Sequence, residues 1–217
     1  LAQFTFGILT DTLDTTGKLL SDGDAVPSEE SILKALPLLI GEVMQVPPKY
    51  SAKNINGARG YALARAGVDF ELAPKKVNIY DITLVSRRSC DEYDFRIECG
   101  GGTYVRSVCR DMAELLGTHA AMSALIREKS GVFELKDAVK SSTLNKDNIS
   151  SHIIPTDSVL PFEAVHMSGD QQKKLLNGLS VPTSLNDGTY KIYLEDGHFY
   201  GLGVADDCRL KVKTKLC

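Results

Sequence analysis

The part of the chain that decides the fold reads GGGTYVR over residues 100–106. Before it, residues 93–99 alternate between apolar and polar side chains, as in a strand with one buried face. After it, apolar residues recur at helical spacing as far as Gly117, which predicts a helix over 104–116 that ends at this glycine. A β-branched run at 77–85 comes earlier, so we expect two strands paired antiparallel across a polar turn at 86–92.

The same segment contains candidate functional side chains. Its glycines allow the backbone to approach a ligand closely, but it is neither GxGxxG nor a Walker loop, because GK[ST] is missing. In an extended strand end, Tyr104 and Arg106 would face the same side. An aromatic ring beside a guanidinium can stack on a base and hold a carboxylate or phosphate. The alternative is a core tyrosine and a surface salt bridge.

The chain opens with period-2 alternation over about residues 2–9, which predicts a strand. Because a native protein rarely starts inside a strand, we expect that an upstream segment has been removed or was never included. The next stretch, TDTLDTTG at 10–17, holds two carboxylates. We expect Asp11 and Asp14 to be turn formers that bond nearby backbone N–H groups, rather than catalytic or RNA-binding residues.

Further elements follow from local pattern. Ser28 can cap a helix with acids in its first turn, and a second helix is expected over about 119–128. Residues 141–151 are polar and suggest a linker. Beyond them, Ser168 to Gln171 is a plausible capping box opening a helix that Gly178 closes, and strands are expected at 190–194, 199–204 and 210–215.

These elements predict an α+β fold with a mixed, largely antiparallel sheet flanked by helices, plus a small β-rich C-terminal domain. The domain boundaries that follow are 1–140, a linker at 141–151, and 152–217.

Charge is spread unevenly. The chain carries a net charge of −3. The stretch from Lys49 to Lys76, however, contains six basic and two acidic residues, a local charge of +4 that leaves −7 for the rest of the chain. Bases, tyrosines and small residues interleave over 45–67, a mixture that suits a loop lying along an RNA backbone. The alternative is a surface hairpin with ordinary lysines.

Other patterns argue against several classes. The five cysteines form no CxxC pair and the histidines no HExxH, so we expect free thiols, no metal site and a cytoplasmic protein. The sequence has no apolar run of about 20 residues, so we expect no membrane span, and it shows no signal peptide.

Several of these segments resemble, in order, the bacterial TruB-type tRNA pseudouridine synthases. The first is GILTDTLDTTG at 7–17, similar to the family's G-x-x-T-D-T-x-D-x-x-G, and the second is QVPPKYSA at 45–52, similar to Q-x-P-P-x-Y-S-A. The resemblance continues through 56–67, and GTYVR at 102–106 is similar to G-T-Y-[IV]-R. Residues 125–133 are similar to the L-R-R-x-x-S-G-x-F region. About 130 residues are covered, and the last 65 or so match more loosely, as a shortened PUA-like RNA-binding domain.

The resemblance implies a pseudouridine synthase fold and an isomerase that converts uridine 55 in the T-loop of tRNA to pseudouridine. The family flips the base out, and an aspartate breaks the N-glycosidic bond before the uracil rejoins through C5. Tyr104 would pack on the base, Arg106 would hold the nucleophilic aspartate ionised and aimed, and Leu125 would be an apolar pocket wall. No cofactor or metal is implied.

The resemblance also makes 45–76 a mobile RNA-clasping insertion, and the expected partner is the T-arm of tRNA, bound by a monomer. The RNA-binding residues implied are Lys49, Tyr50, Ser51, Lys53, Arg59, Arg65 and Arg127.

Three departures qualify the resemblance. Asn54 stands where the family usually has lysine, and Ile126 replaces the first arginine of L-R-R. The family's nucleophile motif, G-T-L-D-P-x-A-x-G-x-L, does not occur in these 217 residues. We therefore expect the nucleophilic Asp upstream and this chain alone to be inactive. The alternatives are a non-catalytic tRNA-binding or tRNA-folding module and, less favoured, an unrelated α+β metabolic enzyme.

Overall fold

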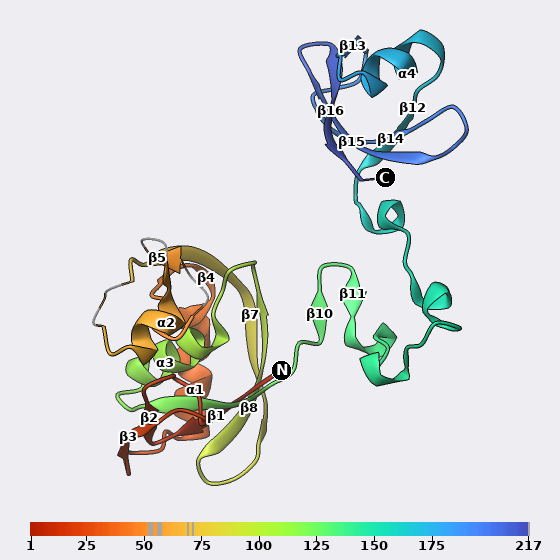
Figure 1. Ribbon diagram of the computed structural model, residues 1–217. Coiled ribbons are helices and arrows are strands. Elements are labelled where there is room, and N and C mark those ends of the chain that lie inside the picture. The colour runs from red at the N-terminus through yellow and green to blue at the C-terminus, as the bar shows by residue number, and fades with distance from the viewer. Residues whose placement is uncertain (52–53, 56–57, 69, 71, 217) are drawn as a thin grey trace. The chain divides into compact units, whose positions relative to one another are not determined.

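The computed structural model describes residues 1–51, 54–55, 58–68, 70 and 72–216 (Figure 1). The chain divides into two compact units, Leu1–Ser130 (unit 1) and Gly131–Cys217 (unit 2), each of which is described by itself. None of the helices in the described part of the chain is long and apolar enough to cross a membrane.

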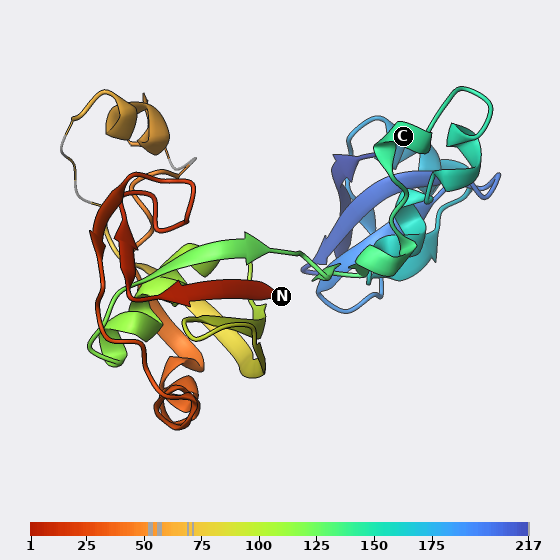
Figure 2. The same ribbon diagram turned by 90° about the horizontal axis from the view of Figure 1, so that it is seen from below.

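Unit 1 is built on an antiparallel sheet with the strand order β4-β7-β8-β1-β9. Its members are β4 (Gly41–Gln45), β7 (Lys75–Arg87), β8 (Glu92–Cys99), β1 (Ala2–Phe6) and β9 (Ala120–Leu125). The hairpin of β7 and β8 confirms the predicted antiparallel pair, while β4 was not predicted from the sequence. The first strand lies inside the sheet, between β8 and the edge strand β9 (Figure 2).

Helix α3 (Val105–Leu115) covers the apolar side of this sheet. Phe4 and Phe6 of β1 are fully buried, as are Val108 and Met112 of the helix, and all four belong to one core cluster. The predicted helix and its end at Gly117, with φ 68°, are confirmed. Burying large side chains from both elements stabilises the unit by about 1.5–3 kcal/mol for each. The described cysteines are all free, as expected.

The remaining elements of unit 1 are short. Helix α1 (Glu29–Ala35) begins at Ser28, whose Oγ accepts from the Ser31 N–H at 3.2 Å, so the predicted cap is confirmed. A 3₁₀ turn (Leu36–Leu39) carries the chain into β4. Two small hairpins join β2 (Ile8–Thr10) to β3 (Leu19–Asp22) and β5 (Asn54–Ile55) to β6 (Ala58–Arg59), and α2 (Gly60–Arg65) follows.

The helix predicted over 119–128 is wrong, because this segment is strand β9. Its alanines, methionine and leucine favour a helix locally. In the structure, however, β9 pairs antiparallel with β1 over residues 120–125, and this pairing satisfies the backbone groups along that edge of β1. Ala120 and Ala121 are small enough to be fully buried there, so tertiary context overrides the local preference.

Unit 2 contains a second sheet with the order β12-β14-β15-β16-β13, in which only the β12–β14 pair is parallel. The predicted strands correspond to β14 (Gly188–Tyr193), β15 (Phe199–Asp206) and β16 (Arg209–Lys215), whereas β12 (Glu163–His166) and β13 (Val181–Pro182) were missed.

Helix α4 (Gly169–Leu176) follows Ser168 and is closed by Gly178, with φ 76°, as predicted. The predicted capping box is wrong, since the Ser168 side chain makes no cap hydrogen bond. The next residue, Gly169, has φ 53°, which starts the helix with an unusual backbone turn.

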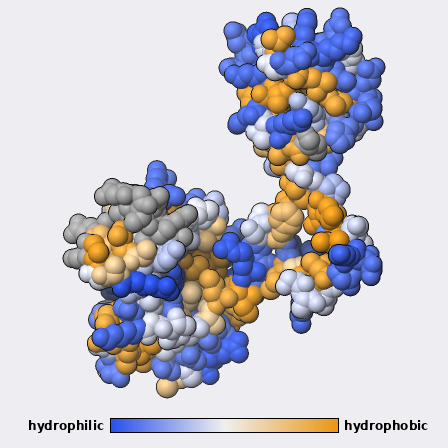
Figure 3. All heavy atoms as spheres, in the orientation of Figure 1, coloured by the Kyte–Doolittle hydropathy of each residue, from blue (hydrophilic) through white to orange (hydrophobic). Residues whose placement is uncertain are grey.

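Residues 131–160 form short turns rather than a packed layer. After the hairpin of β10 (Lys129–Ser130) and β11 (Phe133–Glu134) come 3₁₀ turns at Leu135–Asp137, Ser141–Thr143, Ile149–His152 and Thr156–Val159. Nearly every residue from 131 to 156 is exposed, and Figure 3 shows hydrophobic residues at the surface along this segment.

Candidate active site

The TDTLDTTG turn is held together by its own side chains. Asp14 Oδ1 accepts from the Thr16 N–H at 3.1 Å and from the Thr12 hydroxyl at 2.9 Å. Asp11 Oδ1 accepts from the Lys18 N–H at 2.8 Å. Both aspartates therefore bond nearby backbone N–H groups, as the sequence predicted. Leu13 has φ 62°, a conformation that costs a non-glycine residue energy and is maintained here by the surrounding bonds.

Arg106 connects this turn to two other segments. Its Nη1 donates to the Thr12 carbonyl at 2.8 Å and to Asp14 Oδ2 at 3.0 Å, and its Nη2 donates to the Tyr50 carbonyl at 2.8 Å. The side chains of Arg106 and Asp14 are 22% and 21% exposed, so water screens the pair only in part. Local sequence pattern predicts Asp14 only as a turn former, so this ion pair is a contact that the tertiary structure adds.

The carboxyl of Asp14 is favoured in its ionised form. Burial works against ionisation, but hydrogen bonds from Thr16 and Thr12, together with the positive charge of Arg106, lower the pKa of Asp14 below its ordinary value. The site thus holds a carboxylate and a guanidinium in contact beside the start of α3.

Tyr104 is the residue that precedes α3. Its backbone N–H donates to Oε1 of the buried Gln45 at 2.8 Å. The expectation that Tyr104 and Arg106 lie on an extended strand end is wrong, because helical backbone begins at Val105 and places Arg106 in the first turn. Gly102, with φ 87°, turns the chain directly from β8 into this helix, so the two-residue spacing of a strand does not apply.

Leu125 and Arg127 lie at and after the end of β9. Leu125 pairs with Ala2 of β1 and is 48% exposed, and Arg127 is also exposed. The Asp14 turn contacts the same strand, since the Met122 N–H donates to the Leu13 carbonyl at 3.0 Å. Strand β9 therefore brings the turn and Leu125 to one edge of the sheet.

The basic segment, residues 45–76, begins beside this site, where the Tyr50 carbonyl accepts from Arg106. Ser51, predicted to bind RNA, is buried, and its carbonyl accepts from the Tyr61 N–H at 2.9 Å. Arg65 is exposed, and the Cζ atom of its guanidinium lies 5.8 Å from the centre of the Tyr61 ring. Lys49 is exposed. Of the other predicted RNA-binding residues, Lys53 lies outside the described residues, and only the backbone is described at Arg59.

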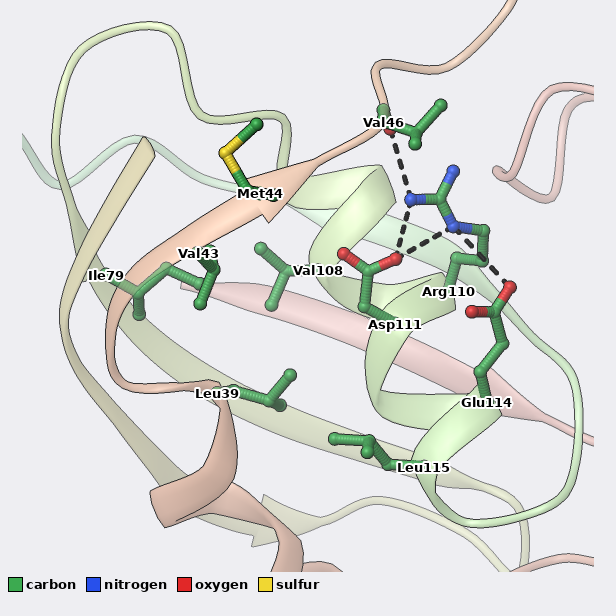
Figure 4. Close-up of a pocket in the computed structure, with 10 residues that line it drawn as sticks. All are labelled: Leu39, Val43, Met44, Val46, Ile79, Val108, Arg110, Asp111, Glu114 and Leu115. Atoms are coloured by element: carbon green, nitrogen blue, oxygen red, sulfur yellow. Dashed lines mark hydrogen bonds and ion pairs between the residues drawn. The ribbon is translucent and has the colours of Figure 1, made fainter. Parts of the chain in front are cut away.

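A cavity of about 670 Å³ lies farther along α3, lined by apolar side chains of β4, β7 and the helix (Figure 4). At its rim, Arg110 Nη2 donates to Asp111 Oδ1 at 2.6 Å and to the Val46 carbonyl at 3.1 Å. Burial raises the pKa of Asp111. The lining of this cavity includes neither Arg106 nor Tyr104, so it is distinct from the site described above.

Comparison with known proteins supports one family. The model of the TruB family pseudouridylate synthase N-terminal domain matches residues 1–105, and that of the pseudouridine synthase II TruB C-terminal region matches residues 164–214. A tRNA pseudouridine synthase B of Clostridium kluyveri is 33% identical over 98% of this chain and 75% of its own length. One from Borrelia garinii subsp. bavariensis is 38% identical over 88% of this chain and 67% of its own length.

Solved structures show the same fold. A Cbf5-Nop10-Gar1 complex is similar with a TM-score of 0.60 at 19% identity, and an H/ACA RNP bound to a substrate RNA with a TM-score of 0.56 at 16% identity. Each similarity covers 94% of this chain, which spans 59% and 58% of the matched chains. On its sequence similarity to the tRNA pseudouridine synthases B, the chain belongs to the TruB family of pseudouridylate synthases.

Proposed function

We propose that the protein isomerises uridine 55 in the T-loop of tRNA to pseudouridine. The observation that carries the proposal is the Arg106 guanidinium, which is held on the Asp14 turn in a chain of the TruB family. A guanidinium that is fixed in place on a turn can hold the charge and orientation of a catalytic carboxylate brought beside it.

In the proposed reaction the target base is flipped out of the T-loop, because a stacked base cannot be reached. An aspartate carboxylate attacks C1′ of the ribose and displaces the uracil, which breaks the N-glycosidic bond at N1. The released uracil rotates and its C5 attacks C1′, which frees the aspartate; the C5 proton is then lost and N1 gains a proton. Tyr104 would pack on the base and help remove this proton, and Leu125 would form an apolar wall.

The nucleophilic aspartate is proposed to come from sequence upstream of Leu1, since the family motif that contains it does not occur in these residues. A guanidinium has five N–H donors. The bonds from Arg106 to Thr12, Asp14 and Tyr50 use three of them. The remaining donors can therefore serve a second carboxylate without breaking the pair with Asp14.

The segment 45–76 is proposed to clasp the T-arm, with Lys49, Tyr50, Ser51, Lys53, Arg59 and Arg65, and Arg127 is proposed to bind RNA from the end of β9. The net charge of +4 on segment 45–76 supports its role in RNA binding. Lysines and arginines that neutralise phosphates release counterions, and this release drives binding. The proposal further includes a PUA-like RNA-binding role for residues 152–217, a monomeric enzyme without metal or cofactor, and a cytoplasmic location.

Tritium release from tRNA labelled at uridine C5 tests the proposal. We expect the full-length protein to release tritium and these 217 residues alone to release none. Turnover by the 217 residues would refute the upstream nucleophile.

A non-catalytic tRNA-binding module is the second candidate, favoured by the missing nucleophile motif. Retarded migration of tRNA with the full-length protein, without pseudouridine formation, would establish this alternative instead.

A further inference from the structure

Tyr104 follows a run of glycines at 100–102, which restrict the backbone less than any other residues do. Thr103, between this run and Tyr104, donates to the Gly100 carbonyl within the same turn. Tyr104 is the N-cap of α3, with φ −98° and ψ 111°, and its side chain makes no capping hydrogen bond. Its carbonyl begins the helix by accepting from the Ser107 N–H at 3.0 Å. The backbone on the N-terminal side of Tyr104 therefore needs a restraint from elsewhere in the fold.

Gln45 supplies this restraint from 59 residues away. It is the last residue of β4, its side chain is buried, and its Oε1 accepts from the Tyr104 N–H at 2.8 Å. Among the described residues it is the only buried amide side chain, and burying an amide is unfavourable unless the amide is hydrogen-bonded. Its Nε2 has no hydrogen-bond partner in the described part of the chain. The bond to Tyr104 is therefore the contact that this buried amide makes.

The same end of β4 contacts the next turns of the helix through separate bonds. The Val46 carbonyl accepts from Oγ of the buried Ser107 at 2.8 Å. It also accepts from Arg110 Nη2 at 3.1 Å, as Figure 4 shows. Removing the Gln45 side chain would leave both of these bonds in place.

Resting on the proposed function, we infer that Gln45 is a positioning residue for Tyr104. By holding the Tyr104 N–H, it fixes the backbone that carries the aromatic ring, while Arg106 keeps its separate bonds on the Asp14 turn. Gln45 then acts on the step in which Tyr104 packs on the uracil and helps to remove the C5 proton. It does not act on the capture of tRNA.

The expected effect falls on kcat. A misplacement of about 1 Å can slow a reaction by about 100-fold, so releasing Tyr104 at its N–H should lower kcat by roughly 10- to 100-fold. KM for tRNA should not change, because the side chains proposed to contact the phosphates are untouched. Stability should fall little in Gln45→Met, since the substitution removes the unpartnered Nε2 together with the bond to Tyr104.

The experiment compares Gln45→Met with Ser107→Ala in the full-length protein. Each variant loses one hydrogen bond between the end of β4 and α3, but only Gln45→Met loses the bond to Tyr104. For Gln45→Met we expect the fall in kcat at an unchanged KM, and hydrogen exchange at the Tyr104 amide, followed by NMR, faster by roughly 5- to 10-fold. Ser107→Ala should keep the wild-type kcat and the wild-type exchange at Tyr104. Equal losses of kcat in the two variants would overturn the inference.

Gln45→Glu tests rescue. A carboxylate oxygen can also accept from the Tyr104 N–H, and negative charge is favoured at the N-terminal end of a helix. Its kcat and its Tyr104 exchange should therefore lie closer to the wild type than to Gln45→Met, and a Gln45→Glu enzyme as slow as Gln45→Met would overturn the inference. If the wild-type protein shows no turnover, the proposed function fails. The positioning of Tyr104 is then decided by its amide exchange, and exchange in Gln45→Met equal to that of the wild type would overturn it.

Discussion

Replacing Arg106 by alanine should destabilise unit 1 measurably, because the side chain joins three segments. The substitution removes one bond to a carboxylate and two to carbonyls, at 2.8–3.0 Å, and leaves Asp14 without its cation. Hydrogen bonds to charged groups contribute about 1.5–3 kcal/mol and other hydrogen bonds about 1 kcal/mol. Because the pair is about one-fifth exposed and water can replace some of these contacts, we expect a total loss of about 2–3 kcal/mol.

The assay is scanning calorimetry of Arg106→Ala and the wild type, with the transition of unit 2 as an internal reference. For a unit of this size, about 1 kcal/mol lowers the melting temperature by roughly 3–4 °C, so the unit 1 transition should fall by about 8 °C. The control is Arg96→Ala, which breaks an exposed pair with Glu128 at 2.9 Å and should lower the melting temperature far less, because water screens exposed pairs. A fall for Arg106→Ala no larger than that of the control would refute the reasoning.

Three further predictions concern the same unit. Arg106→Ala in the full-length protein should abolish tritium release while sparing most tRNA binding, and equal loss of both would argue against an aspartate-orienting role. Gly7→Ala should lower the free energy of unfolding by about 2 kcal/mol or more, because Gly7 has φ 87° and an added Cβ would lie 2.9 Å from the Asp24 carbonyl oxygen. Gly23→Ala is the control, since Gly23 has φ 83° but open space around it. In denaturant titrations Gly23→Ala should lose less unfolding free energy than Gly7→Ala. Since the pKa of Asp14 is lowered in the folded state, its stabilising contribution is present above the unfolded value of 3.8 and is lost as pH falls through the folded pKa. Acid unfolding of Asp14→Asn should accordingly depend less steeply on pH in that range, and an identical pH dependence would contradict the role of the Arg106 pair.

Local pattern predicted the elements whose structure depends on neighbouring residues. The β7–β8 hairpin, helix α3 and the ends of helices at Gly117 and Gly178 follow from alternation, helical spacing and glycines with positive φ. Strand β9 could not be predicted in this way, because its alanine-rich sequence becomes a strand only beside β1.

The candidate site also has a part that the sequence predicts and a part that only the tertiary structure determines. The sequence by itself identified the family segments, the turn-forming aspartates, and Tyr104 and Arg106 as the side chains to examine. Only the tertiary structure placed Asp14 against Arg106, across 92 residues, and Tyr50 against Arg106 and Asp11. The physical reason is that turns, caps and periodicity arise from interactions within a few residues, whereas these contacts exist only after the sheet and α3 have brought distant segments together.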